Sequence, residues 1–142
     1  MTGPTLEKIF LIEQGDYDRA GEASAAIRKA LRQLGVNTDI LRRVSVAAYE
    51  AEMNIAIHSL GGEMHLCVDA HHIVLSTSDR GPGIKDTDKA MTEGFSTADG
   101  KARSMGFGAG MGLPNIRRNA DLFKIQSQLG EGTQIEACFY LE

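Results

Sequence analysis

The sequence feature that most constrains the fold is the clustering of glycine along one stretch of the chain. Of the 16 glycines among 142 residues, eight lie between Gly81 and Gly112. The last four of these alternate strictly with other residues, at Gly106, Gly108, Gly110 and Gly112. Because glycine has no Cβ atom, such a stretch can bend sharply or approach a ligand closely. The clustering therefore predicts one local backbone site rather than a generally flexible chain.

The composition of the chain is typical of one globular domain, and we expect residues 1–142 to form it. The chain is 42% hydrophobic and 24% charged, with a net charge of −4 that offers no broad basic surface to nucleic acid. No apolar run approaches the ~20 residues of a membrane span, and no signal peptide is apparent. Cys67 and Cys138 lack metal-site spacing and are interpreted as buried reduced thiols. A cytoplasmic protein without membrane or nucleic-acid partners is expected.

Hydrophobic periodicity along the chain predicts a small set of strands and helices. Short apolar runs bounded by turn residues predict strands over residues 6–13, 63–69, 71–78, 122–128 and 133–141. Apolar positions at helical spacing predict helices over residues 17–34, 40–60 and 110–120, with a short helix over 85–91. Asp16 or Asp18 is expected to cap the first of these helices.

The short connections between successive strands determine the fold class that we expect. Asp69 to His71 and Leu129 to Gly132 are tight turns, which favour antiparallel pairing of the strands that they join. The sheet is therefore expected to be mixed but mostly antiparallel. With the helices on one face of it, the chain would form an α/β two-layer sandwich.

The first group of polar residues that could carry chemistry lies on the second predicted helix. Glu50 and Asn54 are four residues apart, so they project from the same face of that helix. Their neighbours are mostly apolar, and a carboxylate beside a carboxamide there needs hydrogen-bond partners or a cleft. The alternative is a solvated polar face, to which the neighbouring Glu52 would contribute.

Two further groups contain the clustered glycines. Asp79, Gly81 and Gly83 follow directly after a predicted strand, where a carboxylate could accept a hydrogen bond from an exocyclic amine; the alternative is a plain turn. The alternating glycines from Gly106 to Gly112 lead into a helix, and exposed N–H groups there suit a phosphate. The alternative is a flexible surface loop. The run is not a Walker A loop, and the missing strand–glycine–helix unit disfavours a Rossmann oxidoreductase.

Together, these groups resemble the ATP-binding signature of the GHKL superfamily, which includes gyrase, Hsp90 chaperones, histidine kinases and MutL. The resemblance extends from about residue 41 to 141, and its motifs are Glu50-x-x-x-Asn54, Asp79-x-Gly81-x-Gly83, Gly106-x-Gly108-x-Gly110-x-Gly112 and Gly132-Thr133. It implies the Bergerat fold. Two stretches, residues 90–97 and 108–118, look more like the RsbT-type switch kinases than the RsbW-type anti-sigma factors.

The resemblance also implies a role for each site residue. Asn54 would ligate Mg²⁺, Glu50 would act as the catalytic base, and Asp79 would bind the adenine amine with support from Thr133. The glycine run would hold the phosphates, and residues from about 94 to 112 would form an ATP lid. The nucleotide-binding residues so implied are Asn54, Asp79, Gly81, Gly83, Ile84, Gly106, Gly108, Gly110, Met111, Gly112, Leu113 and Thr133.

The function that the resemblance implies is an ATP-dependent serine/threonine kinase of a partner-switching module. Its substrate would be a STAS-domain protein that antagonises an anti-sigma factor, and a sigma factor or PP2C-like phosphatase would be the regulated target. A homodimer is left open. Two alternatives stand beside this reading. One is a non-catalytic, ATP-gated anti-sigma module, which has no need of Glu50 as a base; the other is a histidine-kinase-like ATPase fragment.

Overall fold

The computed structural model describes residues 5–13, 15, 19–81, 112–128 and 130–141, in five strands and three helices. The short helix expected over residues 85–91 and the expected lid over residues 94–111 lie outside the described residues. The elements are, in chain order, β1 (Leu6–Ile12), α1 (Glu22–Gln33), α2 (Thr38–His58), β2 (Gly62–Val68), β3 (His72–Asp79), α5 (Gly112–Asn119), β4 (Leu122–Gln128) and β5 (Gly132–Tyr140).

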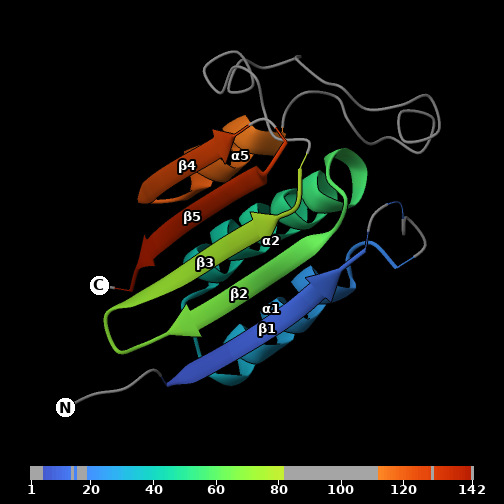
Figure 1. The fold of residues 1–142 in the computed structure, drawn as a ribbon. Coiled ribbons are helices and arrows are strands. Elements are labelled where there is room, and N and C mark those ends of the chain that lie inside the picture. Colours follow the sequence, from blue (N-terminus) through green and yellow to red (C-terminus); the bar gives the residue numbers. More distant parts are fainter. Residues whose placement is uncertain (1–4, 14, 16–18, 82–111, 129, 142) are drawn as a thin grey trace.

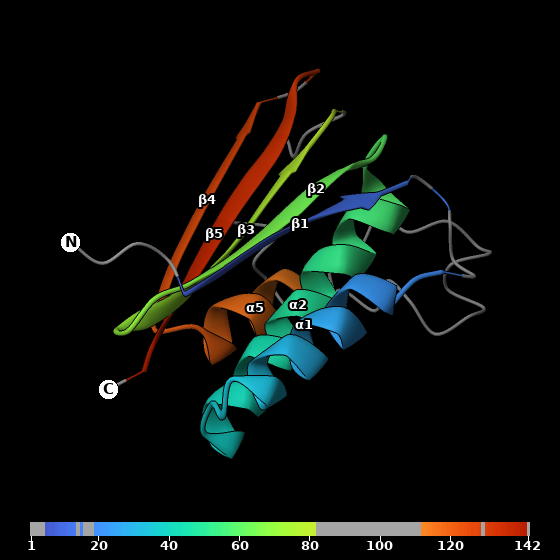
Figure 2. The ribbon, with the colours of Figure 1, turned by 90° about the horizontal axis from the view of Figure 1, so that it is seen from below.

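The strands form one sheet in the order β1-β2-β3-β5-β4, and all four pairings among the described strands are antiparallel. The helices α1, α2 and α5 all cover the same face of this sheet, with α2 between the other two (Figures 1 and 2). The α/β two-layer sandwich expected from the sequence is therefore confirmed. No helix in the described part of the chain is long and apolar enough to cross a membrane.

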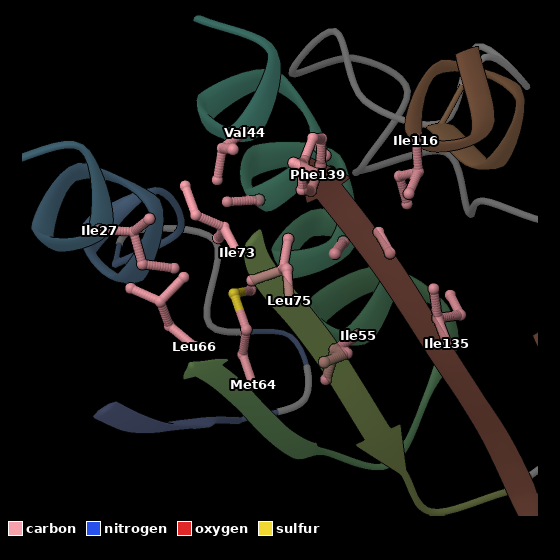
Figure 3. Close-up of a cluster of buried hydrophobic side chains, with 14 of the residues drawn as sticks. Ile27, Val44, Ile55, Met64, Leu66, Ile73, Leu75, Ile116, Ile135 and Phe139 are labelled. Carbon is pink, nitrogen blue, oxygen red and sulfur yellow. The ribbon is translucent and has the colours of Figure 1, made fainter. Parts of the chain in front are cut away.

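The core lies between the sheet and the helices, because alternate residues of each strand point to the same face. Figure 3 shows side chains of the central strands packing against those of the helices. Residues of this core with no exposed surface include Ile27, Val44, Ile55, Met64, Leu66, Ile73, Ile116 and Phe139. The other face of the sheet carries no helix among the described elements. Both cysteines are free thiols; Cys138 is buried as expected, but Cys67 is partly exposed.

The start of α1 differs from the sequence prediction. The helix begins at Glu22 rather than near residue 17, and its N-cap residue, Gly21, offers no side chain to the helix. The carboxylate of Glu52, on α2, accepts hydrogen bonds from the backbone N–H groups of Gly21 (3.0 Å), Ala23 (3.2 Å) and Ser24 (3.0 Å). Asp16 and Asp18, which were expected to cap this helix, lie outside the described residues. Among the described residues, a carboxylate from another helix accepts hydrogen bonds at the start of α1.

The burial of Glu52 argues against the alternative that α2 has a solvated polar face at this point. The side chain of Glu52 is only 3% exposed, so it does not belong to a solvated polar face of α2. A buried carboxylate is tolerated where several N–H groups donate to it, and the free N–H groups at a helix N-terminus are well suited to do so. The side chain of Glu52 thus connects α2 to the start of α1.

Candidate functional site

Glu50 and Asn54 lie one turn apart on α2, and both side chains are half-buried. The neighbouring element is α5, which packs against α2. A Cβ atom at position 112 would lie 3.1 Å from Oε2 of Glu50. Gly112, the last of the alternating glycines, therefore lets the first residue of α5 approach the Glu50 carboxylate closely.

The surroundings of Glu50 increase its affinity for a proton. Burial raises the pKa of the Glu50 carboxyl, and a hydrogen bond from the side chain of Asn115 opposes that shift. The adjacent Tyr49 also has a raised pKa, through burial first and then through the negative charges of Glu50 and Glu52. A half-buried carboxylate with a raised pKa is suited to accept a proton from a hydroxyl group.

The second part of the site joins β3 to β5. Asp79 is the last residue of β3, and its Oδ1 accepts a hydrogen bond from the backbone N–H of Thr133 at 3.0 Å. Burial raises the pKa of the Asp79 carboxyl, and the hydrogen bond from Thr133 opposes the shift. Thr133 is only 4% exposed, and its hydroxyl is 2.8 Å from that of Ser127 on β4. Among the described residues, the side-chain hydrogen bond of Asp79 is made through Oδ1 alone.

Glycine at position 132 makes the contact between Asp79 and Thr133 possible. The φ angle of Gly132 is +131°, a conformation that other residues rarely adopt. A Cβ atom there would overlap the carbonyl oxygen of Asp79. Gly81 is tied to the same turn, because its N–H donates to the carbonyl oxygen of Glu131 at 3.0 Å. The two strand ends therefore approach more closely than side chains would allow.

The sequence-predicted site residues that the structure describes form two groups. Glu50, Asn54 and Gly112 lie on α2 and α5, and Asp79, Gly81 and Thr133 lie at the β3–β5 pairing. Leu113 belongs to the hydrophobic core, against which it packs α5. The other predicted residues lie outside the described part of the chain, namely Gly83, Ile84, Gly106, Gly108, Gly110 and Met111.

Asn54 is the described residue that could hold a divalent cation. Mg²⁺ usually takes one or two protein oxygen ligands and completes its shell with phosphates and waters. The half-buried carboxamide of Asn54, one turn from Glu50, fits that limited role. Among the described residues, no cluster of three or more His, Cys, Asp or Glu side chains could enclose a metal ion.

Sequence reasoning missed two polar residues that are linked to the predicted ones. Asn115, on α5, acts to lower the pKa of Glu50. Ser127, on β4, lies with its hydroxyl 2.8 Å from that of Thr133 on β5. No spacing in the sequence connects Asn115 to Glu50, because 65 positions separate them. The available signal was a polar residue between the apolar Pro114 and Ile116, both of which the structure buries.

Comparisons with known proteins show which family the sequence matches. The chain matches the family described as "Histidine kinase-like ATPase domain" over residues 14–139. It is 33% identical over 118 residues to the serine/threonine-protein kinase RsbT of Bacillus subtilis, covering 80% of this chain and 83% of that protein. It is 30% identical over 97 residues to the anti-sigma F factor of Clostridium acetobutylicum, covering 65% of this chain and 64% of that protein.

The fold is also found among solved structures. A chain in the crystal structure of the SiaB–SiaC complex from Pseudomonas aeruginosa superposes with a TM-score of 0.57. The match covers 94% of this chain and 89% of that chain, at 14% sequence identity. At that identity the likeness establishes the fold alone.

Proposed function

We propose that this protein, which belongs to the histidine kinase-like ATPase domain family, is a serine/threonine kinase that transfers a phosphoryl group from MgATP to a partner protein. The observation that carries the proposal is the carboxylate of Glu50. It is half-buried, has a raised pKa, lies beside the first residue of α5 and is one turn from Asn54. Phosphoryl transfer depends mainly on positioning and charge stabilisation, and a base beside a cation ligand supports that chemistry.

Each described residue would have a defined task in this reaction. Glu50 would accept the proton of the attacking hydroxyl, and Asn54 would hold the cation through its side-chain oxygen. Asp79, held by Thr133, would accept a hydrogen bond from the adenine amine. Bound Mg²⁺ would neutralise charge on the phosphates. The backbone N–H groups from Gly106 to Gly112 would bind the phosphates, with residues 94–112 as the lid.

The partner that we propose is a STAS-domain protein with an acceptor serine or threonine. The similarity to RsbT and to an anti-sigma F factor supports a place in a partner-switching module. In such a module the same surface would alternately hold the STAS protein and a second target, a sigma factor or a PP2C-like phosphatase. The sequence similarity to a kinase and the presence of Glu50 both favour catalysis over binding alone.

The deciding experiment is incubation of the full chain with γ-labelled ATP and a purified STAS-domain protein. Label on a serine or threonine of the partner would support the proposal. ATP-dependent binding of the partner without transfer of label would favour a non-catalytic anti-sigma module. Turnover of ATP that does not require a protein acceptor would favour an ATPase.

Replacement of Asp79 by asparagine is expected to weaken ATP binding roughly tenfold. Because the N–H of Thr133 bonds one side-chain oxygen, the asparagine amide would turn its NH₂ group toward the ligand. The asparagine NH₂ group and the adenine amine would then both be donors and could not hydrogen-bond each other. The base of an inosine nucleotide has a carbonyl oxygen at that position, which would accept a hydrogen bond from the NH₂ group. Calorimetric titration with ATP and with ITP checks this, with Asp69→Asn in the β2–β3 turn as the control. Unchanged preference for ATP over ITP in Asp79→Asn would contradict the assignment.

Replacement of Asn54 by alanine is expected to remove the magnesium-dependent part of nucleotide affinity. ATP binding is measured with excess Mg²⁺ and again with EDTA, and the affinity gained from Mg²⁺ should fall by about tenfold in the variant. Affinity in EDTA should stay the same, because Asn54 acts through the cation. Asn119→Ala removes a similar side chain from the last residue of α5 and serves as the control. An undiminished magnesium effect in Asn54→Ala would place the ligand elsewhere.

A further inference from the structure

We propose that the hydroxyl group of Thr77 is a further ligand-binding group of the ATP site, and that it hydrogen-bonds a ring nitrogen of the adenine base, directly or through one water molecule. This inference rests on the proposed function, because it concerns the nucleotide proposed there. It deepens that function by adding a residue that recognises the base to Asp79 and Thr133.

Thr77 is a polar residue in the buried row of β3, and it is only 5% exposed. In the sheet it lies between Met64 of β2 and Ile135 of β5, both of which belong to the hydrophobic core. Figure 3 shows these two side chains together with Ile55 of α2. Because paired residues of neighbouring strands point to the same face, the side chain of Thr77 points toward the helices.

Thr77 differs from the other buried polar residues in its hydrogen bonding. Ser24, Glu52, Ser59 and Thr133, the other buried polar side chains among the described residues, each make a hydrogen bond. The hydroxyl group of Thr77 makes none within the part of the chain that the structure describes. A nearly buried polar group without a partner lowers stability, so in a native protein it usually serves a bound molecule.

The hydroxyl oxygen of Thr77 can still be reached by a bound molecule. Each completely enclosed side-chain oxygen or nitrogen of the described residues has a hydrogen-bond partner. Because the Thr77 hydroxyl has none, its oxygen must keep a small accessible surface within the 5% that the residue exposes. That surface lies on the helix-covered face of the sheet, which is also the face of Asp79.

The distance from Asp79 connects Thr77 to the adenine base. The two residues are two positions apart on β3, so their side chains lie on one face, about 6.6 Å apart along the strand. Asp79 is proposed to bind the adenine amine, and the ring nitrogens N1 and N7 on either side of that amine accept hydrogen bonds. The Thr77 hydroxyl can donate to one of them, and one bond of about 2.8 Å, or two through a water, would reach it.

Replacing Thr77 by valine separates ligand binding from a purely structural role, because the two predict opposite changes in stability. Valine has the shape of threonine without the hydroxyl, so packing against Met64 and Ile135 should be kept. Without nucleotide, the urea midpoint of Thr77→Val should rise, since an unpaired hydroxyl is removed from the core. Removing a hydroxyl that served the fold alone would lower the midpoint.

Calorimetric titration tests the contact with the base. Thr77→Val should bind ATP roughly tenfold more weakly than the natural chain, and Thr77→Ser, which keeps the hydroxyl, should bind it more tightly than Thr77→Val. The titrations are repeated with 1-deaza-ATP and 7-deaza-ATP, in each of which carbon replaces one ring nitrogen. The difference between Thr77→Val and the natural chain should disappear for one of these analogues. Ser76→Ala removes a hydroxyl from the opposite face of β3, and this control should bind all three nucleotides normally.

These measurements distinguish failure of the inference from failure of the proposed function. Equal ATP affinity in Thr77→Val and the natural chain would overturn the inference, as would a difference that persists with both deaza nucleotides or a lowered urea midpoint. None of the measurements needs a partner protein, so missing phosphoryl transfer would contradict the kinase alone. Failure of the natural chain to bind ATP would overturn both.

Discussion

Replacing Glu50 by glutamine is expected to lower phosphoryl transfer to the partner protein by at least about a hundredfold. The glutamine side chain has nearly the same shape, so its packing beside Gly112 should persist. It cannot accept a proton from the attacking hydroxyl, which is the task proposed for the carboxylate. ATP affinity should change by less than about threefold, because the adenine contact lies on β3 and β5 instead.

The measurement is single-turnover transfer of labelled phosphate over a range of pH. In the natural chain, the rate should fall as the pH decreases through the pKa of Glu50, because protonation removes the base. Since burial raises that pKa, the fall should begin at a higher pH than for an ordinary glutamate. The rate of the Glu50→Gln variant should not show this decrease at low pH. Glu136→Gln, an exposed change on β5, is the matched control. A normal rate in Glu50→Gln would show that the base is another group.

Replacing Glu52 by leucine is expected to lower the free energy of unfolding by about 3 kcal/mol. The leucine side chain fills a similar volume, so little packing is lost. The N–H groups of Gly21, Ala23 and Ser24 would, however, lose the carboxylate that accepts from all three. Those groups lie at a largely buried helix start, where water replaces the lost acceptor poorly.

Urea unfolding followed by circular dichroism provides the test of this effect. Glu52→Leu should have a lower midpoint with an unchanged slope, since the folded surface should be the same. Glu22→Gln is the control, because Glu22 is an exposed acidic residue in the first turn of the same helix. It should cost less than about 0.5 kcal/mol. Equal midpoints for Glu52→Leu and Glu22→Gln would mean that the buried carboxylate does not stabilise α1.

The sequence was sufficient to predict the strands and the longest helix, because their patterns are local. The predicted strand over residues 122–128 coincides with β4, and the helix predicted over residues 40–60 corresponds to α2 within two residues at each end. Alternation with a period of two residues distinguishes the core face of a strand from its other face. The same local reasoning placed Glu50 and Asn54 on one face of α2, since four residues complete about one helical turn.

Contacts between distant parts of the chain were not predictable in this way. The alternative of a solvated polar face that includes Glu52 was wrong for that residue, because its partners at the start of α1 lie 28 to 31 positions away. The link between Asp79 and Thr133 came only from the family resemblance, since 54 positions separate them. The influence of Asn115 on the pKa of Glu50 depends on how α5 packs against α2. The roles of the remaining glycines stay predictions, because those residues lie outside the described part of the chain.

The central position of α2 makes its register intolerant of insertions and deletions. Within five consecutive positions, this helix directs Glu50 to α5, Glu52 to α1 and Asn54 to the face that it shares with Glu50. One added or deleted residue would rotate everything beyond it by about 100° around the helix axis. The Glu52 carboxylate would then no longer point to the start of α1, or Asn54 would no longer share a face with Glu50. In diverging copies of this chain, changes of length should therefore accumulate in the turns and not within α2.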